Sequence, residues 1–247
     1  CAMILELDCG NSLIKWRLLS AEGVRAGFAQ DQESLFYSLR EIRDGHLSAI
    51  RLVSVRNEPE TQAIACALEK AFGRVCNIAQ PAAQLGGVTN GYEDYRSLGM
   101  DRWLAVVGAY ALTRQACLVL DLGTAITADF VSAAGQHLGG FICPGMPLLR
   151  TELRTHTGRI RYGDEAARAA LASSGPGRET AQAVERGCLW MVRGFLREQR
   201  ELADHLLEPG YAIFLTGGDA ELVSEYLPDA RLAPDLVFTG LAIACPV

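Results

Sequence analysis

Long apolar runs and clustered basic residues are both missing from this 247-residue sequence. The longest nearly apolar stretch, residues 103–112, is about half of the roughly 20 residues that a membrane-spanning helix needs. The 23 basic residues are outnumbered by 29 acidic ones, which gives a net charge of −6, and they form no cluster that could follow a phosphate backbone. These absences exclude a transmembrane helix and argue against a membrane or nucleic acid as partner.

Paired metal ligands and a secretory signal are also missing. The histidines (46, 137, 156, 205) and the cysteines (1, 9, 66, 76, 117, 143, 188, 245) are scattered, without C-x-x-C or H-E-x-x-H spacing. We therefore expect no zinc site, and we interpret the cysteines as buried free thiols. The N-terminus reaches the acidic Glu6 and lacks the basic segment followed by an apolar segment that a secretory signal has, which favours a cytoplasmic location. Met3 is interpreted as the natural start after a two-residue remnant.

The sequence has the apolar content of a folded α/β protein. Hydrophobic residues make up 49% and charged residues 21%, so the chain can bury a core. Hydrophobic periodicity predicts strands that alternate with helices, which is typical of an α/β fold. The expected strands are 4–8, 13–19, 49–55, 117–131 (two strands around a turn) and 211–216; the expected helices are 33–43, 60–72, 101–112, 146–155, 180–202 and 220–227; residues 81–99 and 156–177 are expected to be loops.

One turn occurs twice. The segment Asp8-Cys-Gly-Asn11 follows an apolar strand and precedes another, and Asp121-Leu-Gly-Thr124 does the same 113 residues later. A repeat at half the chain length indicates a duplicated domain. We therefore predict two domains, 1–115 and 116–247.

Both turns have the residues that a polyphosphate site needs. Glycine backbone N–H groups bind phosphate oxygens, and Asn, Ser, Thr and Lys side chains add donors, here from Asn11, Ser12, Lys15, Thr124 and Thr127. The carboxylates of Asp8 and Asp121 would repel phosphate unless a cation lay between carboxylate and phosphate, as Mg²⁺ does in kinases. Each turn alone could be an ordinary hairpin turn, but two copies and a later Thr216-Gly-Gly turn favour a nucleotide site.

These motifs resemble those of a known superfamily. The Asp8-x-Gly-Asn-x-x-x-Lys-Trp, Asp121-x-Gly-Thr-Ala-x-Thr and Thr216-Gly-Gly segments resemble the nucleotide-binding segments of actin, the heat-shock chaperone ATPases and the sugar kinases. Gly99-Met-Asp-Arg-Trp103 and Gly139-Gly-x-Ile-x-Pro-Gly145 are similar to the type III pantothenate kinases in particular, and the resemblance extends to residue 241. It implies two duplicated actin-like (ribonuclease H-like) domains with the nucleotide between them.

The resemblance also implies roles for individual residues. ATP would contact the first turn and one residue of the second, with Asp8 holding Mg²⁺ and Asp121 a monovalent cation, K⁺ or NH₄⁺. Pantothenate would contact the G-x-D-R segment, Tyr92 and Thr180, although Glu179 stands where the family usually has Asn. The implied ATP-binding residues are Asp8, Cys9, Gly10, Asn11, Ser12, Leu13, Ile14, Lys15 and Thr124; the implied substrate-binding residues are Tyr92, Gly99, Met100, Asp101, Arg102 and Thr180.

Asp101 is the candidate catalytic residue. Phosphorylating an alcohol needs a carboxylate that accepts the hydroxyl proton, and Asp101 opens an apolar helix after a glycine-rich loop. Its spacing fits a helix N-cap equally well, and the resemblance favours the general base. Arg102 has the planar fork that binds a carboxylate such as that of pantothenate, although an exposed structural arginine would look the same. Thr180 could also be a helix cap, and Tyr92 an ordinary loop aromatic.

The expected activity is transfer of phosphate from ATP to pantothenate, the first step of coenzyme A synthesis. Family members are homodimers, and the helix at 184–196 is either part of such an interface or core. Two rival interpretations remain open: a sugar or other small-molecule kinase of the superfamily, and a regulator that senses nucleotide without turnover.

Overall fold

The chain forms two compact units. The computed structural model describes residues 3–42 and 47–247, so Cys1, Ala2 and His46 lie outside the described residues. Unit 1 runs to residue 115 and includes 134–138 and 235–247, whereas unit 2 comprises 116–133 and 139–234. The sequence-based division at 115 coincides with the end of the first segment, but it does not include the two segments that return to unit 1.

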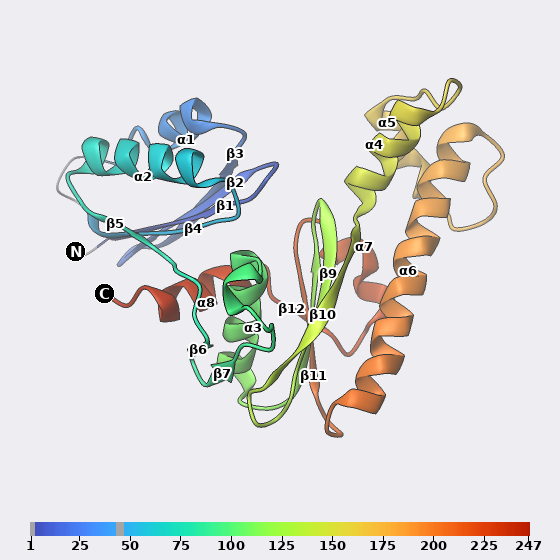
Figure 1. Cartoon of the computed structure of the whole chain (residues 1–247). Coiled ribbons are helices and arrows are strands. Elements are labelled where there is room, and N and C mark those ends of the chain that lie inside the picture. Colours follow the sequence, from blue (N-terminus) through green and yellow to red (C-terminus); the bar gives the residue numbers. More distant parts are fainter. Residues whose placement is uncertain (1–2, 43–46) are drawn as a thin grey trace. The chain divides into compact units, whose positions relative to one another are not determined.

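Unit 1 contains a five-stranded sheet of order β3-β2-β1-β4-β5. Strands β1 (Met3–Cys9), β2 (Ile14–Ser20) and β3 (Gly23–Ala29) are antiparallel, and β4 (Leu47–Ser54) and β5 (Cys76–Ile78) continue the sheet in parallel. Helices α1 (Gln32–Leu39) and α2 (Glu58–Phe72) cover one face (Figure 1). Alternate residues of β1 and β2 point into the core below these helices: Leu5, Leu7, Cys9, Ile14, Trp16 and Leu18.

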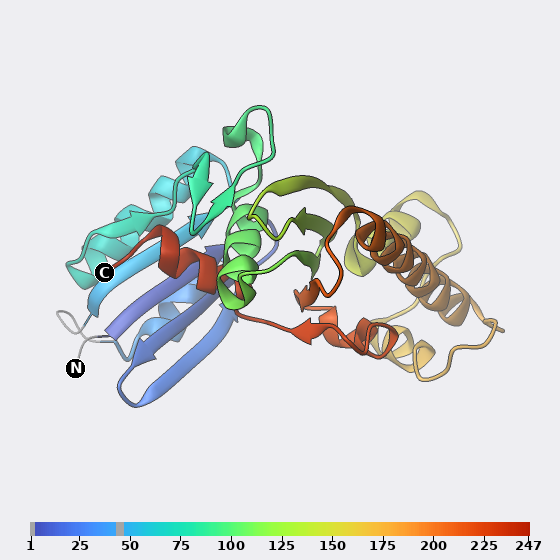
Figure 2. The ribbon, with the colours of Figure 1, turned by 90° about the horizontal axis from the view of Figure 1, so that it is seen from below.

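The opposite face of this sheet is covered by α3 (Met100–Thr113) and α8 (Leu236–Ala244), which pack closely together (Figure 2). A side chain at Gly240 would overlap the carbonyl of Leu104, and one at Gly108 would overlap the carbonyl of Leu236. Glycine at both positions therefore lets the helix backbones touch. Since α8 and the sheet enclose α3, its residues 102–110 are all buried.

A buried ion network lies on this face of the sheet. Glu6 is fully buried and accepts hydrogen bonds from Arg17 Nε and, at 2.8 Å, from Arg51 Nη1. Arg17 also pairs with Asp235 at 3.2 Å and lies 4.9 Å from the ring centroid of Phe238. The network thus ties the start of α8 to β2, which explains why the C-terminal segment belongs to unit 1.

Unit 2 repeats the strand order, as β10-β9-β8-β11-β12. Strands β8 (Cys117–Leu122) and β9 (Ala125–Val131) are antiparallel, β10 (His137–Pro144) lies beyond β9, and β11 (Ala212–Thr216) and β12 (Arg231–Leu232) run parallel to β8. The long helix α6 (Thr180–Leu206) packs against α4 (Met146–His156) and α5 (Asp164–Ala170), and the short α7 (Ala220–Val223) follows β11. The matching strand orders confirm the predicted duplicated α/β fold.

Several predicted elements differ from the structure. The segment 156–177, expected to be a loop, contains α5, and the loop 81–99 contains a small hairpin of β6 (Gln84–Leu85) and β7 (Val88–Thr89) and a 3-10 turn, Tyr95–Ser97. The last expected helix, 220–227, is α7 followed by a 3-10 turn, Ser224–Tyr226. These pieces are too short for hydrophobic periodicity to reveal.

All seven described cysteines are free, and five of them are buried as predicted. Cys143 is half-buried, and Cys66 is exposed because it lies on the outer face of α2, whose inner face is buried. Helix α6 is both core and surface over 184–196, since Val192 is buried whereas Trp190 and Met191 are exposed. Within residues 3–42 and 47–247, no helix is long and apolar enough to cross a membrane.

Candidate functional site

The first predicted phosphate turn joins β1 to β2 in unit 1. The Gly10 N–H donates to the Leu13 carbonyl at 3.0 Å, and Arg56 Nε donates to the Gly10 carbonyl at 2.9 Å, so the turn is closed and anchored. Asn11 and Ser12 are exposed at its tip. This arrangement presents polar side chains on a fixed backbone, as a phosphate site requires.

The sheet register separates the residues of this turn into two groups. Asp8 is opposite Lys15, and Cys9 is opposite Ile14. Cross-strand partners share a face, so the carboxylate and the ammonium lie on the face away from α1 and α2. Cys9 and Ile14 are fully buried in the core, where burial and the nearby Asp8 carboxylate raise the pKa of the Cys9 thiol to about 12. Their side chains are therefore not available to a nucleotide.

The second predicted turn, residues 121–124, lies at the end of β8 in unit 2. The Asp219 N–H donates to the Leu122 carbonyl at 2.9 Å, and the Gly145 N–H donates to the Thr124 carbonyl at 2.9 Å. Three glycine-containing segments that are distant in sequence therefore meet here: 121–124, Gly145 and 216–219. Their convergence provides closely spaced backbone at the carboxyl ends of β8 and β11, where α/β folds bind ligands.

Gly217 shows why the third segment needs glycine. Its φ of +92° is unfavourable for other residues, and a side chain there would overlap Asp121 Oδ1 and the Leu122 carbonyl. The Thr216-Gly-Gly turn is thus packed directly against the Asp121 turn. Asp121 is half-buried and Thr124 is exposed.

Asp101 lies in the first turn of α3, in unit 1. Gly99 is the N-cap, so the alternative of Asp101 as N-cap is wrong, and Met100 is the first helical residue. Asp101 Oδ1 accepts a hydrogen bond from the Arg102 N–H at 2.8 Å. A carboxylate at this end of a helix is stabilised in its charged form by the helix dipole, which suits a general base.

Arg102 and Tyr92 form a pair beside Asp101. Arg102 is buried, and its Nη1 donates to the Tyr92 hydroxyl at 2.8 Å, with the guanidinium carbon 5.6 Å from the ring centroid. The exposed structural arginine considered as an alternative is therefore wrong. Tyr92 comes from the loop that precedes α3, so the loop and the helix together position one guanidinium fork.

His137 joins this cluster although no sequence motif pointed to it. Its ring stacks on Tyr92 with a centroid distance of 6.2 Å and an interplanar angle of 16°, and its Nδ1 accepts from the Gly91 N–H at 3.3 Å. The pairing connects residues 45 positions apart, and a lone histidine in an unassigned strand carries no local signal. Only the three-dimensional arrangement reveals it.

Thr180 is the first residue of α6, in unit 2, and it is exposed. Because the N-cap is Glu179, which makes no side-chain cap, the alternative of Thr180 as cap is wrong. One turn further along, the fully buried Glu185 accepts hydrogen bonds at 2.6 Å from Arg150 Nε and Nη2 and at 2.7 Å from the Tyr162 hydroxyl. These hydrogen bonds outweigh burial, so the pKa of Glu185 is lowered.

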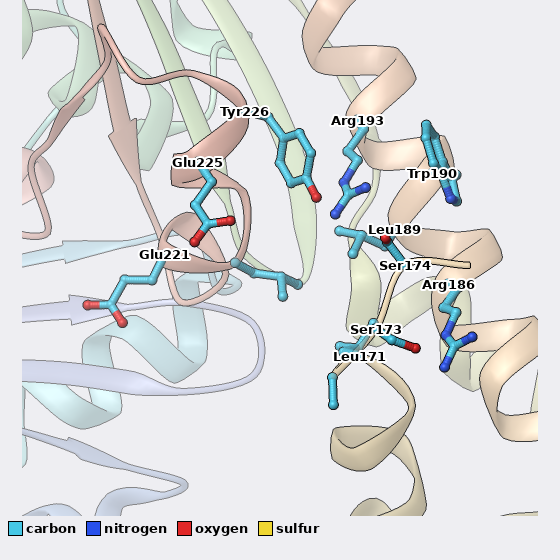
Figure 3. A pocket seen from close by; sticks show the side chains of 12 residues that line it. Leu171, Ser173, Ser174, Arg186, Leu189, Trp190, Arg193, Glu221, Glu225 and Tyr226 are labelled. Atoms are coloured by element: carbon cyan, nitrogen blue, oxygen red, sulfur yellow. The ribbon is translucent and has the colours of Figure 1, made fainter. Parts of the chain in front are cut away.

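A separate pocket of about 410 Å³ lies in unit 2, between α6 and the α7 region. Figure 3 shows Arg193 reaching from α6 toward Tyr226, whose ring centroid is 3.4 Å from the guanidinium carbon. Trp190 flanks the same side chain, and Glu221 and Glu225 line the pocket from the opposite side. The volume is typical of a small-molecule site. None of the catalytic, substrate-binding, ATP-binding or metal-binding residues predicted from the sequence lines this pocket.

The carboxylates of the two turns are compatible with Mg²⁺. Mg²⁺ commonly binds one or two carboxylates and completes its shell with water and substrate phosphates. Each turn has one such carboxylate, Asp8 or Asp121, next to backbone suited to phosphate. In the described parts of the chain, no three His, Cys, Asp or Glu side chains group into a metal site made by the protein alone.

Comparison with solved structures defines the class of the fold. A Baf-family protein from Campylobacter jejuni aligns over 97% of this chain and 96% of its own, with a TM-score of 0.62 and 20% identity. MreB5 of Spiroplasma citri bound to AMPPNP aligns over 98% and 95%, with a TM-score of 0.52 and 12% identity. The chain therefore has the duplicated actin-like fold.

Sequence comparison then gives the family. The model of the type III pantothenate kinase family matches residues 4–201. A type III pantothenate kinase of Pseudomonas aeruginosa is 58% identical over 247 residues, covering 99% of this chain and all of the relative, and one of Pseudomonas fluorescens is 56% identical over 248 residues with the same coverage. The chain belongs to the type III pantothenate kinase family.

Proposed function

We propose that this protein transfers the γ-phosphoryl group of ATP to the primary hydroxyl of pantothenate, giving 4′-phosphopantothenate and ADP in the first step of coenzyme A synthesis. The observation that supports this most is the family match over nearly the whole chain, together with Asp101 and Arg102 side by side at the start of α3. A carboxylate and a guanidinium in adjacent positions suit a substrate with a hydroxyl at one end and a carboxylate at the other.

In this proposal, Asp101 accepts the proton of the attacking hydroxyl. The hydroxyl oxygen forms a bond to the γ-phosphorus while the bond to the β–γ bridging oxygen breaks, and ADP carries that electron pair away. Arg102 binds the pantothenate carboxylate through its fork, and Tyr92 holds that fork through the 2.8 Å hydrogen bond. Thr180 is proposed as a further pantothenate contact.

The two aspartate turns are proposed to bind the nucleotide. Backbone N–H groups of the first turn, Lys15 and the Thr124 hydroxyl would contact phosphate oxygens. Mg²⁺, held by Asp8, would neutralise charge on the phosphates, and a monovalent cation, K⁺ or NH₄⁺, is assigned to Asp121. The exposed position of Asn11, Ser12 and Thr124 is consistent with contact to a ligand.

A coupled assay of ADP release tests the proposed reaction. Purified protein with MgATP should release ADP when pantothenate is added and not when glucose is added. Replacing K⁺ by Na⁺ should lower the rate, and excess chelator should abolish it. Phosphorylation of glucose instead would support the rival sugar kinase, and ATP binding without ADP release under any condition would support the rival regulator.

We also propose that the protein is a homodimer. Trp190 and Met191 are 59% and 63% exposed on α6, which places apolar surface where a second copy could cover it. Sedimentation equilibrium should give twice the chain mass. Trp190→Glu should shift that mass toward the monomer, and a wild-type monomer would contradict the assignment.

A further inference from the structure

We propose that His137 is a positioning residue for pantothenate: it holds Tyr92, and through Tyr92 the Arg102 fork that binds the substrate carboxylate. The proposal rests on the function proposed above and adds a residue from a segment that sequence reasoning left without a role.

The segment around His137 is docked firmly on the loop that carries Tyr92. The Thr89 N–H donates to the Gly135 carbonyl at 2.9 Å, and Thr89 forms a parallel bridge with Gln136. Gly135 has a φ of +80°, and a side chain there would overlap the Gly87 carbonyl. The backbone of residues 134–138 is therefore held against the loop, and the position of His137 is set by backbone contacts.

The imidazole makes two different contacts with the loop. It stacks on the Tyr92 ring at 6.2 Å and 16°, and Nδ1 accepts the Gly91 N–H. The second contact requires Nδ1 to be unprotonated, so a neutral His137 carries its proton on Nε2. His137 is 1% exposed, so both contacts are shielded from water. One side chain thus fixes both the ring plane of Tyr92 and the backbone just before it.

Tyr92 passes this constraint to Arg102. Its hydroxyl accepts from Arg102 Nη1 at 2.8 Å, and the stacked imidazole limits rotation of the phenol ring. An arginine fork binds a carboxylate well only when its plane is already oriented, because ordering it on binding costs affinity. Loss of His137 should therefore weaken recognition of the carboxylate and leave the chemical step at Asp101 largely intact.

Three substitutions separate the two contacts. His137→Ala removes both, His137→Phe keeps an aromatic ring for stacking, and His137→Asn keeps an acceptor near the position of Nδ1. KM and kcat are measured for pantothenate and for panthenol, in which a primary alcohol replaces the carboxylate. His205→Ala, an exposed histidine in the last turn of α6, is the matched control, and thermal unfolding checks that each variant is folded.

We expect His137→Ala to raise KM for pantothenate about 3- to 10-fold, with kcat within about 2-fold of wild type, which is the range that an aromatic pair contributes. The KM for panthenol should change much less, and the Phe and Asn variants should each recover part of the loss. Equal losses for both substrates, or unchanged KM in a folded His137→Ala protein, would overturn the proposal. Wild-type protein that does not phosphorylate pantothenate would instead refute the proposed function, and this proposal with it.

Discussion

Substituting Gly99 by alanine should move the Asp101 carboxylate, which we propose as the general base, without disturbing the fold. Gly99 has φ −54° and ψ 132°, which alanine adopts without strain. A methyl group there would lie 2.9 Å from Asp101 Oδ1, whereas an ordinary contact is about 3.5 Å. The carboxylate must therefore shift by about 0.6 Å. Because a misplacement of about 1 Å can cost about 100-fold in rate, we expect kcat to fall on the order of 10-fold.

The control for Gly99→Ala is Gly163→Ala. Gly163 is also a helix N-cap with negative φ, and no atom lies within 4 Å of the position of its missing side chain. Both substitutions should cost a similar stability, about 0.5–1 kcal/mol in urea unfolding, since alanine is a poor N-cap. Only Gly99→Ala should lower kcat in the coupled assay. Equal kcat values for the two variants would refute the claim that Gly99 makes room for the Asp101 carboxylate.

Four further substitutions test the packing and burial described for the fold. Glu185→Gln should lower the free energy of unfolding at pH 7 by about 2–4 kcal/mol. Because the pKa of Glu185 is lowered in the folded state, its stabilisation is complete above about pH 4.5 and disappears at more acidic pH. A difference in stability from wild type that stays constant across pH would contradict this origin. Gly240→Ala should cost at least about 1–3 kcal/mol in urea unfolding by forcing α8 away from α3, and wild-type stability would mean that the helices do not touch there. Cys66→Ser should lower the number of thiols that react rapidly at pH 8 by one, because Cys66 is exposed. Cys9→Ser should leave that number unchanged, because burial raises the pKa of the Cys9 thiol to about 12. The reverse pattern would contradict the described burial of Cys9.

The sequence was sufficient for the duplicated fold because its main elements follow local rules. The strand–Gly turn–strand repeat and the apolar runs of β1 and β8, most of whose residues are buried, depend on neighbours in sequence, and they predict the central strands of the two sheets. The short hairpin of β6 and β7, by contrast, depends on the docking of residues 134–138 against it. Long-range contacts also explain why the return of residues 235–247 to unit 1 could not be predicted. The ion network that holds the start of α8 joins residues more than 200 positions apart.

The candidate site was predictable to a similar extent. The G-x-D-R motif indicated Asp101 and Arg102 because they are adjacent, and the structure adds that Gly99, not Asp101, is the helix cap. His137 was not predictable, because its partners lie 45 and 46 positions away and no motif connects them. The sequence predicted a buried Cys9 thiol, but it could not show that Cys9 and Ile14 face away from Asp8 and Lys15, which follows from the register of β1 and β2.

The proposed mechanism is tested most directly by replacing Asp101 with asparagine and measuring pantothenate-dependent ADP release. Asparagine keeps the size and the acceptor for the Arg102 N–H but removes the base. We predict that kcat falls about 100- to 10,000-fold, the usual contribution of a general base, while KM for pantothenate and thermal stability stay close to wild type. A folded Asp101→Asn protein with kcat within a few-fold of wild type would contradict the assignment of Asp101 as the base.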